Sequence, residues 1–187
     1  MGIRGRAIAV IVAAFIGLGA VLLTGCAGRA QAVFTKPELL TYERLAVIGL
    51  DAENEQIFMA AYIKTFISRP VTFVERSRLA EIIGEQDLLQ GRLDDRTRAK
   101  IKKILGVEAL IMCEYYKDDD RPGSRMKLRV RVVDSETGAI VGSALTDTYS
   151  NFAQHAQAAV EALKADLLDE GYRRSYPPSP ETTPPSR

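Results

Sequence analysis

The sequence has 187 residues, with 25 lysines and arginines against 24 aspartates and glutamates, and a formal net charge of +1 at neutral pH. This length is enough for one folded domain and too short for two ordinary ones. A near-neutral chain lacks the basic face that nucleic-acid binding requires, so we expect no nucleic-acid partner.

The first 25 residues have the pattern of a secretory signal peptide. Arg4 and Arg6 form a basic head, and an apolar run interrupted only by glycine follows from Ala7 to Leu22. Small residues at a cleavage site complete the pattern. The alternative is a helix that stays in the membrane, but the run of about sixteen residues is shorter than the ~20 that a bilayer core requires. We therefore expect residues 1–25 to be removed as a lipoprotein signal peptide.

The end of this run resembles the lipobox of bacterial lipoproteins. Leu23, Thr24 and Gly25 stand directly before Cys26. In lipoproteins this cysteine takes a diacylglycerol and becomes the new N-terminus, so the resemblance implies lipidation of Cys26 and a permanent membrane anchor. Because Ala27 follows the cysteine and aspartate does not, the sorting rule of that family implies the outer membrane, with the domain facing the periplasm.

The second cysteine is expected in the core. With Cys26 acylated, Cys113 is the one thiol that remains, so no disulfide within the chain stabilises the fold. Cys113 lies in an apolar run, where a free cysteine behaves as a small hydrophobe.

The mature chain divides into a tether, a domain and a tail. Residues 26–41 include Pro37 and show no periodic pattern, which indicates a flexible tether after the acylated cysteine. Residues 175–187 hold five of the eight prolines, with serine and threonine between them, which is typical of a disordered, extended tail. The folded domain is therefore predicted over residues 42–174.

The domain begins with a strand–helix–strand pattern. Leu45–Leu50 is a short apolar run, typical of a strand that is buried on both faces. Asn54–Arg69 has the spacing of a helix with a broad apolar side, and Pro70 ends it because the residue before a proline is pushed out of helical geometry. Val71–Val74 follows as a second strand, rich in β-branched residues.

Two further helices come next. Ser77 is a suitable N-cap for the first, in which Gly84 is a weak position because glycine disfavours helices. The residues expected on its inner side are Leu79, Ile82, Ile83 and Leu89. The second begins after Asp94 or Asp95 and ends at Gly106 as a C-cap. Its inner residues are expected to be Ile101, Ile104 and Leu105.

Three strands and a helix complete the domain. Val107–Tyr115 is the most apolar strand and is expected near the centre of the sheet. Met126–Val132 alternates between apolar residues and Lys127, Arg129 and Arg131, so one face should lie in the core and the other in water. A hairpin turn over Ser135–Gly138 leads into a strand over Ala139–Tyr149. The last helix begins near Phe152 and carries one apolar stripe.

The order β-α-β-α-α-β-β-β-α predicts a single α/β domain with a mixed sheet of about five strands flanked by about four helices. Alternating strands and helices favour parallel pairing at one side of the sheet, and the hairpin favours antiparallel pairing at the other.

No residue pattern for catalysis, a metal or a cofactor is apparent in the sequence. The chain has one histidine, His155, and neighbouring residues offer no partner at metal-ligand spacing, so we expect it on the surface or at the core boundary. No glycine-rich phosphate-binding loop occurs. We therefore expect no cofactor and no enzymatic activity.

Two segments carry a resemblance to a known family. They are Val74–Leu79, continuing through Ile82–Gln86 to Gly91, and Ile104–Ile111 with the later Val133–Gly138. The chain resembles the curli production assembly/transport (CsgG-like) lipoproteins and their LpoB-like relatives, which activate penicillin-binding proteins. The resemblance covers the domain from about Leu45 to Leu168 and includes the lipobox. Val107–Glu108 departs slightly from the family, which often has Ala-Asp there.

The resemblance implies a non-enzymatic module that binds an envelope protein, either a component of curli-type export or a peptidoglycan synthase activated in the LpoB manner. An alternative is a structural subunit that assembles with itself into an oligomeric envelope complex. Arg129 and Arg131 are candidates for the interaction surface because the strand alternation places them on the solvated face.

The anchor is tested by the substitution Cys26→Ser, which we expect to abolish incorporation of labelled fatty acid and to leave the protein uncleaved or soluble. Radiolabelled palmitate followed by membrane fractionation measures both outcomes. Unchanged labelling of the variant would overturn the lipoprotein interpretation, because Cys113 is then the only thiol left.

Overall fold

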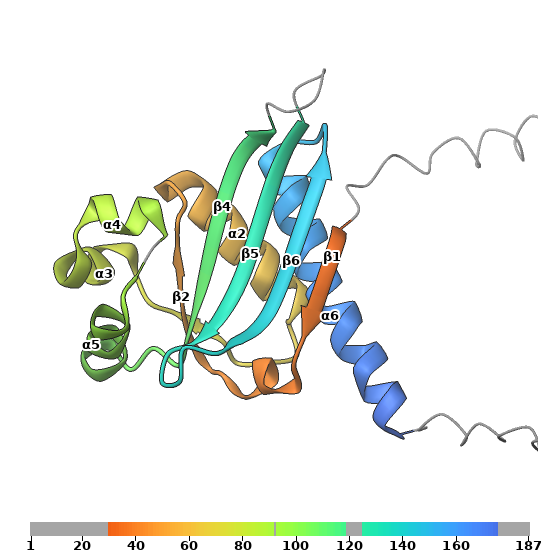
Figure 1. Cartoon of the computed structure of the whole chain (residues 1–187), viewed down its shortest axis with the longest axis horizontal. Helices are drawn as coiled ribbons and strands as arrows, with labels where there is room; N and C mark the ends of the chain where they lie inside the picture. The colour runs from red at the N-terminus through yellow and green to blue at the C-terminus, as the bar shows by residue number, and fades with distance from the viewer. Residues whose placement is uncertain (1–29, 92, 119–124, 176–187) are drawn as a thin grey trace, which may run out of the picture.

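The computed structural model describes residues 30–91, 93–118 and 125–175 of the chain (Figure 1). The predicted signal peptide, the lipobox with Cys26 and residues 176–187 of the predicted tail lie outside the described residues. The predictions for these segments therefore stay predictions.

The described residues form six strands, five α-helices and one 3-10 helix. In chain order they are β1 (Ala30–Thr35), η1 (Pro37–Thr41), β2 (Arg44–Ile48), α2 (Ala52–Thr65), β3 (Thr72–Phe73), α3 (Arg76–Ile83), α4 (Glu85–Gln90), α5 (Asp95–Leu105), β4 (Ala109–Asp118), β5 (Arg125–Asp134), β6 (Ile140–Thr148) and α6 (Phe152–Ser175). The predicted class, a single α/β domain with a mixed sheet, is confirmed. The predicted counts are one strand and one α-helix too low.

The strands form one sheet in the order β1-β6-β5-β4-β2-β3. β2 runs parallel to both β3 and β4, whereas the pairs β4–β5, β5–β6 and β6–β1 are antiparallel. This is the predicted division into a parallel and an antiparallel part. β4 lies inside the sheet between β5 and β2, as its apolar sequence indicates.

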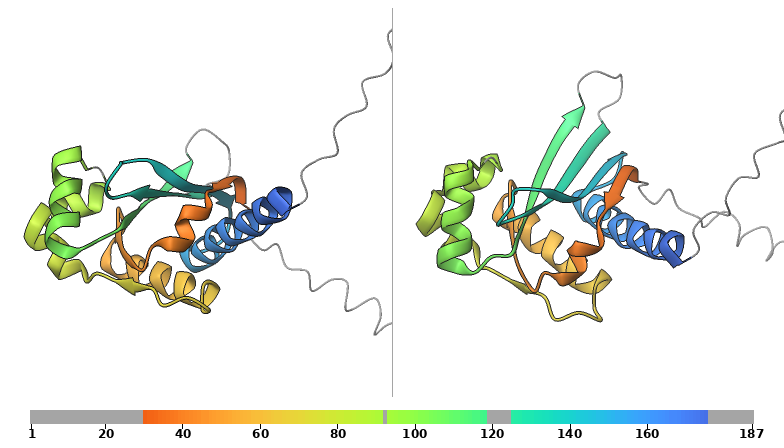
Figure 2. Two further views of the ribbon diagram at one scale, coloured as in Figure 1. Left: turned by 90° about the horizontal axis from the view of Figure 1, so that it is seen from below. Right: turned by 60° about the horizontal axis from the view of Figure 1, so that its bottom comes forward.

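Helices cover the two faces of the sheet unequally. On one face, α2 and α6 pack over the sheet and bury Leu45 and Val47 of β2. On the other face, α3, α4 and α5 bury Ala46 and Ile48 of the same strand. Figure 2 shows α3, α4 and α5 grouped at the β2 end of the domain, with α6 at the β1 end. β2 is therefore buried on both faces, as its continuous apolar run predicts.

The flexible tether predicted for residues 26–41 is wrong over Ala30–Thr41, so the folded domain does not start at residue 42. Ala30–Thr35 forms β1 and pairs with β6, with Val33 opposite Ala144. The backbone N–H of Lys36 then donates to the carbonyl of Val141 at 2.7 Å, and the side chain of Leu39 in η1 is buried. This strand satisfies backbone groups of β6 that would otherwise lie at an open edge.

The helix predicted from Ser77 to Leu89 is broken into α3 and α4 at Gly84, whose φ of +79° is left-handed and favours glycine. The helical phase restarts at Glu85. As a result Leu88 is buried and Leu89 is 47% exposed, so the prediction that Leu89 points inward is wrong.

The caps of α5 are as predicted, but its apolar face is narrower. The Asp94 side chain accepts a hydrogen bond from the N–H of Thr97 at 2.7 Å, and Gly106 ends the helix in the left-handed region. Ile101 is fully buried, whereas Ile104 is 58% exposed and therefore does not point inward as expected.

A close backbone contact joins the ends of β2 and α4 to β4. Gly49 has a φ of +87°, and a Cβ at this position would lie 1.9 Å from the carbonyl oxygen of Cys113. Its N–H donates to the carbonyl of Leu88 at 2.6 Å. Cys113 itself is fully buried, as predicted, and burial raises the pKa of its thiol. Only glycine fits this junction.

The two isoleucines of α5 form a matched pair that tests the packing. We expect Ile101→Ala to lower the free energy of unfolding by about 2–5 kcal/mol, since it removes a fully buried side chain. Ile104→Ala, the same change on the same helix, should alter it by less than about 0.5 kcal/mol because that side chain is largely exposed. Urea unfolding of both variants measures the difference, and equal losses would contradict the observed orientation of α5.

Candidate functional site: an open face of the sheet

One face of the antiparallel part of the sheet carries no helix. α3, α4 and α5 cover this face over β2 and the start of β4 but do not extend across β5, β6 and β1 (Figure 1). The strand register places alternate residues of these strands on this face. We use the name open sheet face for the following described side chains: Phe34, Glu114, Tyr116, Arg125, Lys127, Arg129, Arg131, Ser143, Leu145 and Asp147.

The alternation of β5 positions the arginines. Leu128, Val130 and Val132 are fully buried against α2 and α6. The side chains between them point to the opposite face, where Arg129 is 46% and Arg131 35% exposed. The structure thus places both predicted candidate residues on the solvated side of the sheet.

Glu114 of β4 joins the two arginines. Arg129 donates from Nη1 to Oε2 of Glu114 at 2.9 Å, and Arg131 donates from Nη2 to Oε1 at 3.1 Å. One carboxylate therefore lies between two guanidinium groups, and the cluster keeps a net positive charge. Exposed ion pairs of this kind add little stability, about 0–1 kcal/mol. Their effect is to orient both guanidinium groups toward Glu114.

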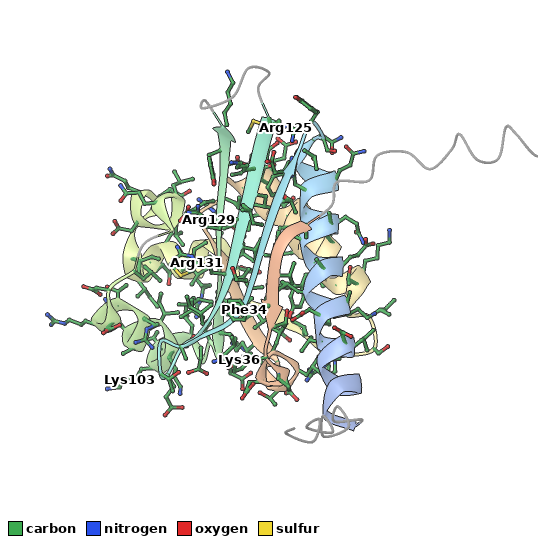
Figure 3. The ribbon with its side chains drawn as sticks, turned by 45° about the vertical axis from the view of Figure 1, so that its right-hand side comes forward. Phe34, Lys36, Lys103, Arg125, Arg129 and Arg131 are labelled. Atoms are coloured by element: carbon green, nitrogen blue, oxygen red, sulfur yellow. The ribbon has the colours of Figure 1, made fainter. Side chains whose placement is uncertain are left out.

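Aromatic rings accompany the cations along β5. The Arg129 guanidinium carbon lies 5.6 Å from the centre of the Tyr116 ring, and Nη2 donates to the Tyr116 hydroxyl at 3.3 Å. Further along, the Arg125 guanidinium carbon lies 4.9 Å from the ring centre of Tyr149, which follows β6. Figure 3 shows Arg125, Arg129 and Arg131 along this strand. Such pairs are typical cation–π contacts.

The balance of charge on the open sheet face is positive. Among the side chains that the structure describes on this face, β5 contributes four cations, Arg125 to Arg131 at alternate positions, and the neighbouring strands contribute two carboxylates, Glu114 and Asp147. Arg125 approaches Asp147 to 4.0 Å. Guanidinium groups donate paired hydrogen bonds that match carboxylates, so this surface can bind an acidic partner.

His155 lies in the core and not on the surface, so the expected surface or boundary position is wrong. Its ring is fully buried between α6 and β6, with Nδ1 2.6 Å from the Thr146 hydroxyl and Nε2 3.3 Å from that of Thr148. It also packs edge-on against Tyr115 at 5.6 Å. These contacts satisfy both ring nitrogens and give the histidine a structural role.

The described residues contain neither a metal-ligand cluster nor a membrane-spanning helix. No group of three or more histidine, cysteine, aspartate or glutamate side chains in the described ranges could hold a metal ion. None of the described helices combines the length and hydrophobicity that crossing a membrane requires.

The class defined by these features is a single-domain α/β protein with a half-covered mixed sheet. Within it, the family model of the curli production assembly/transport component CsgG matches residues 66–115, from the end of α2 into β4. The resemblance to CsgG-like lipoproteins is confirmed for this part of the chain. The relationship to the LpoB-like branch stays a hypothesis.

Some solved structures show partial similarity to this chain. A PelC dodecamer from Paraburkholderia phytofirmans is 15% identical with a TM-score of 0.45, and the alignment covers 75% of this chain and 96% of that chain. A PelC point variant in another crystal form is 14% identical with a TM-score of 0.46, covering 75% and 97%. A lipoprotein from Neisseria meningitidis is 14% identical with a TM-score of 0.35, covering 73% and 99%. A comparison with curated protein sequences finds no match.

The buried histidine predicts sensitivity to acid. Burial lowers the pKa of His155 below its usual 6.5 and outweighs the opposing charge of Asp147. The unfolded chain therefore takes up the proton more readily, so this contribution to stability is present above pH 6.5 and is lost as the pH falls below it. We expect Tm to fall between about pH 7 and about pH 5.

The matched variant is His155→Gln, measured by thermal unfolding across the same pH range. It should have a lower Tm at neutral pH and a smaller dependence of Tm on pH than the wild type. An unchanged pH profile in the variant would show that His155 does not carry this effect.

Proposed function

We propose that the protein is an outer-membrane-anchored periplasmic lipoprotein whose CsgG-like domain acts as a non-enzymatic protein-interaction module in cell-envelope assembly or curli-type export. The observation that carries this proposal is the open sheet face, which presents arginines and aromatic rings to solvent. The matched family, described as an assembly and transport component, supports the cellular context.

The chemistry of the open sheet face defines the partner. Its cations outnumber its carboxylates, and arginine and tyrosine are among the residues that dominate binding energy in protein interfaces. Glu114 already accepts hydrogen bonds from Arg129 and Arg131, which brings both guanidinium groups together before a partner binds. The proposed partner is an envelope protein that presents an acidic surface with room for the Tyr116 ring.

The anchor follows from the proposed lipidation of Cys26. Several acyl chains on one cysteine hold a protein on a membrane far more firmly than the marginal, reversible binding of a single chain. A domain held in this way needs only a weak interaction surface, since its partner is met repeatedly in the same compartment.

The double variant Arg129→Glu/Arg131→Glu tests the interaction surface. We expect it to fold with an unchanged Tm and to lose its partner in cross-linking pull-downs from the native envelope, because it presents carboxylates to an acidic surface. Lys103→Glu is the matched control: it reverses an exposed cation on α5, away from the open sheet face (Figure 3).

The outcomes separate the candidate functions. A heterologous envelope protein that is lost from the double variant and kept by the Lys103→Glu variant supports the proposal, and its identity distinguishes export from LpoB-like activation of a peptidoglycan synthase. Cross-links only between copies of this chain support the structural-subunit alternative. Equal recovery of the partner by both variants would contradict a role for the open sheet face.

A further inference from the structure

A second candidate site lies at the opposite end of the domain from β1. A pocket of about 330 Å³ opens between the beginnings of α2 and α3, where β2 and β3 end. Its walls include Glu55 and Met59 from α2, and Phe73, Val74 and Arg76 from β3 and the start of α3.

The topology places this pocket where open α/β sheets form crevices. β2 and β3 are parallel neighbours. The chain leaves β2 into α2, which covers one face of the sheet, and leaves β3 into α3, which covers the other. Adjacent strands whose connections depart to opposite faces leave a crevice beyond their carboxyl ends, and ligands bind there in open α/β folds.

A buried carboxylate lines the pocket. Glu55 is only 3% exposed, and its Oε2 accepts a hydrogen bond from Nη1 of Arg76 at 2.6 Å. Its other oxygen, Oε1, accepts none of the hydrogen bonds found among the described residues. It is also not one of the buried polar atoms that lack a partner, so Oε1 remains accessible from the pocket. Burial also raises the pKa of Glu55, against the effect of Arg76.

The guanidinium group of Arg76, which pairs with Glu55, is already hydrogen-bonded to other groups of the protein. Nη1 of Arg76 also donates to the carbonyl of Leu50 at 2.8 Å, and Nε and Nη2 donate to the carboxylate of Glu85. Two carboxylates, those of Glu55 and Glu85, pair with this one guanidinium group, and Glu75 adds a second carboxylate to the lining of the pocket. The pocket is therefore negative, and an anionic ligand would meet repulsion there.

We propose that this pocket binds an ammonium group on an apolar stem, with Glu55 Oε1 as the acceptor. Met59, Phe73 and Val74 supply an apolar wall for the methylenes, as lysine stems commonly lie along apolar surface while the charged end finds a polar partner. Such a group is present in a lysine side chain of a protein and in a free alkylamine. The volume suits one side chain of this size.

The pocket is separate from the open sheet face in position and in sign of charge. The open sheet face is positive and lies on β4, β5, β6 and β1, whereas the pocket is negative and lies beyond β2 and β3. The inference therefore stands whether or not the open sheet face binds an acidic partner.

The experiment uses the isotope-labelled full protein, as isolated, in detergent micelles. Three probes are titrated by NMR: pentylamine, an acetylated tripeptide with a central lysine, and 1-pentanol, which has the same stem as pentylamine without the charge. We expect the amide signals of Glu55, Arg76 and Ser77 to shift with the two ammonium probes and not with the alcohol. Shifts with the peptide alone identify a lysine side chain as the ligand, and shifts with both show that a free amine suffices.

Three substitutions give the test its controls. Glu55→Gln should weaken the binding of the ammonium probes by at least about tenfold, because it removes the charge of the acceptor and keeps its shape. Glu53→Gln, the same change on an exposed residue of the same helix outside the pocket, should have no effect. Glu75→Gln should weaken binding less, and it decides the question if the Glu55→Gln protein does not fold.

The proposal is overturned if neither ammonium probe shifts the pocket signals, or if 1-pentanol shifts them equally. It is also overturned if Glu55→Gln folds and binds as the wild type does, or if Glu75→Gln binds normally where Glu55→Gln is unfolded.

Discussion

The burial of β2 on both faces is the constraint on which the rest of the domain depends. The strand pairs with β3 and β4, and its side chains alternate between two separate apolar clusters, one beneath α2 and α6 and one beneath α3, α4 and α5. A strand that contributes to two clusters needs helices on both sides. The crossover from β2 to β3 places α2 on one face, where α6 joins it, and the crossover from β3 to β4 places α3, α4 and α5 on the other. On the second face, α3, α4 and α5 pack over β2 and the start of β4. They therefore do not cover β5, β6 and β1.

Both candidate sites follow from this arrangement. The open sheet face exists because the hairpin strands extend past the helices that enclose β2, and the pocket exists because the two crossovers diverge. The nearly neutral total charge conceals how charge is distributed: cations gather along β5 and carboxylates gather around Arg76. Composition alone therefore excludes a uniformly basic surface but says nothing about local patches of opposite sign.

The sequence predicted correctly the elements that are determined by residues close together in the chain. The apolar run of β2, the alternation of β5 and the caps of α5 could be read from neighbouring residues, and the structure has them. β1 could not be predicted, because its only reason to be extended is pairing with β6, more than a hundred positions away in the sequence. The break at Gly84 shifts the helical phase of the residues that follow it. Leu88 therefore points inward, in place of Leu89, which the sequence predicted.

The candidate sites were predictable only in part. Arg129 and Arg131 follow from alternation, but their shared partner Glu114 depends on a strand register that the sequence does not display. The burial of Glu55 could have been predicted from its spacing. It precedes Phe58 by three positions and Tyr62 by seven, so it lies on the apolar side of α2. An acidic residue in such a stripe indicates a buried ion pair, and Arg76 provides it.

The early start of β1 changes how the domain would sit on a membrane. With Cys26 as the proposed anchor and Ala30 already in the sheet, four peptide units separate lipid from fold, a span of at most about 14 Å. Such a short connection would restrict rotation, and the anchored domain would move laterally with the lipid along the membrane surface. Its search for a partner would then be two-dimensional, and the partner would have to present its binding surface within one domain height of the bilayer.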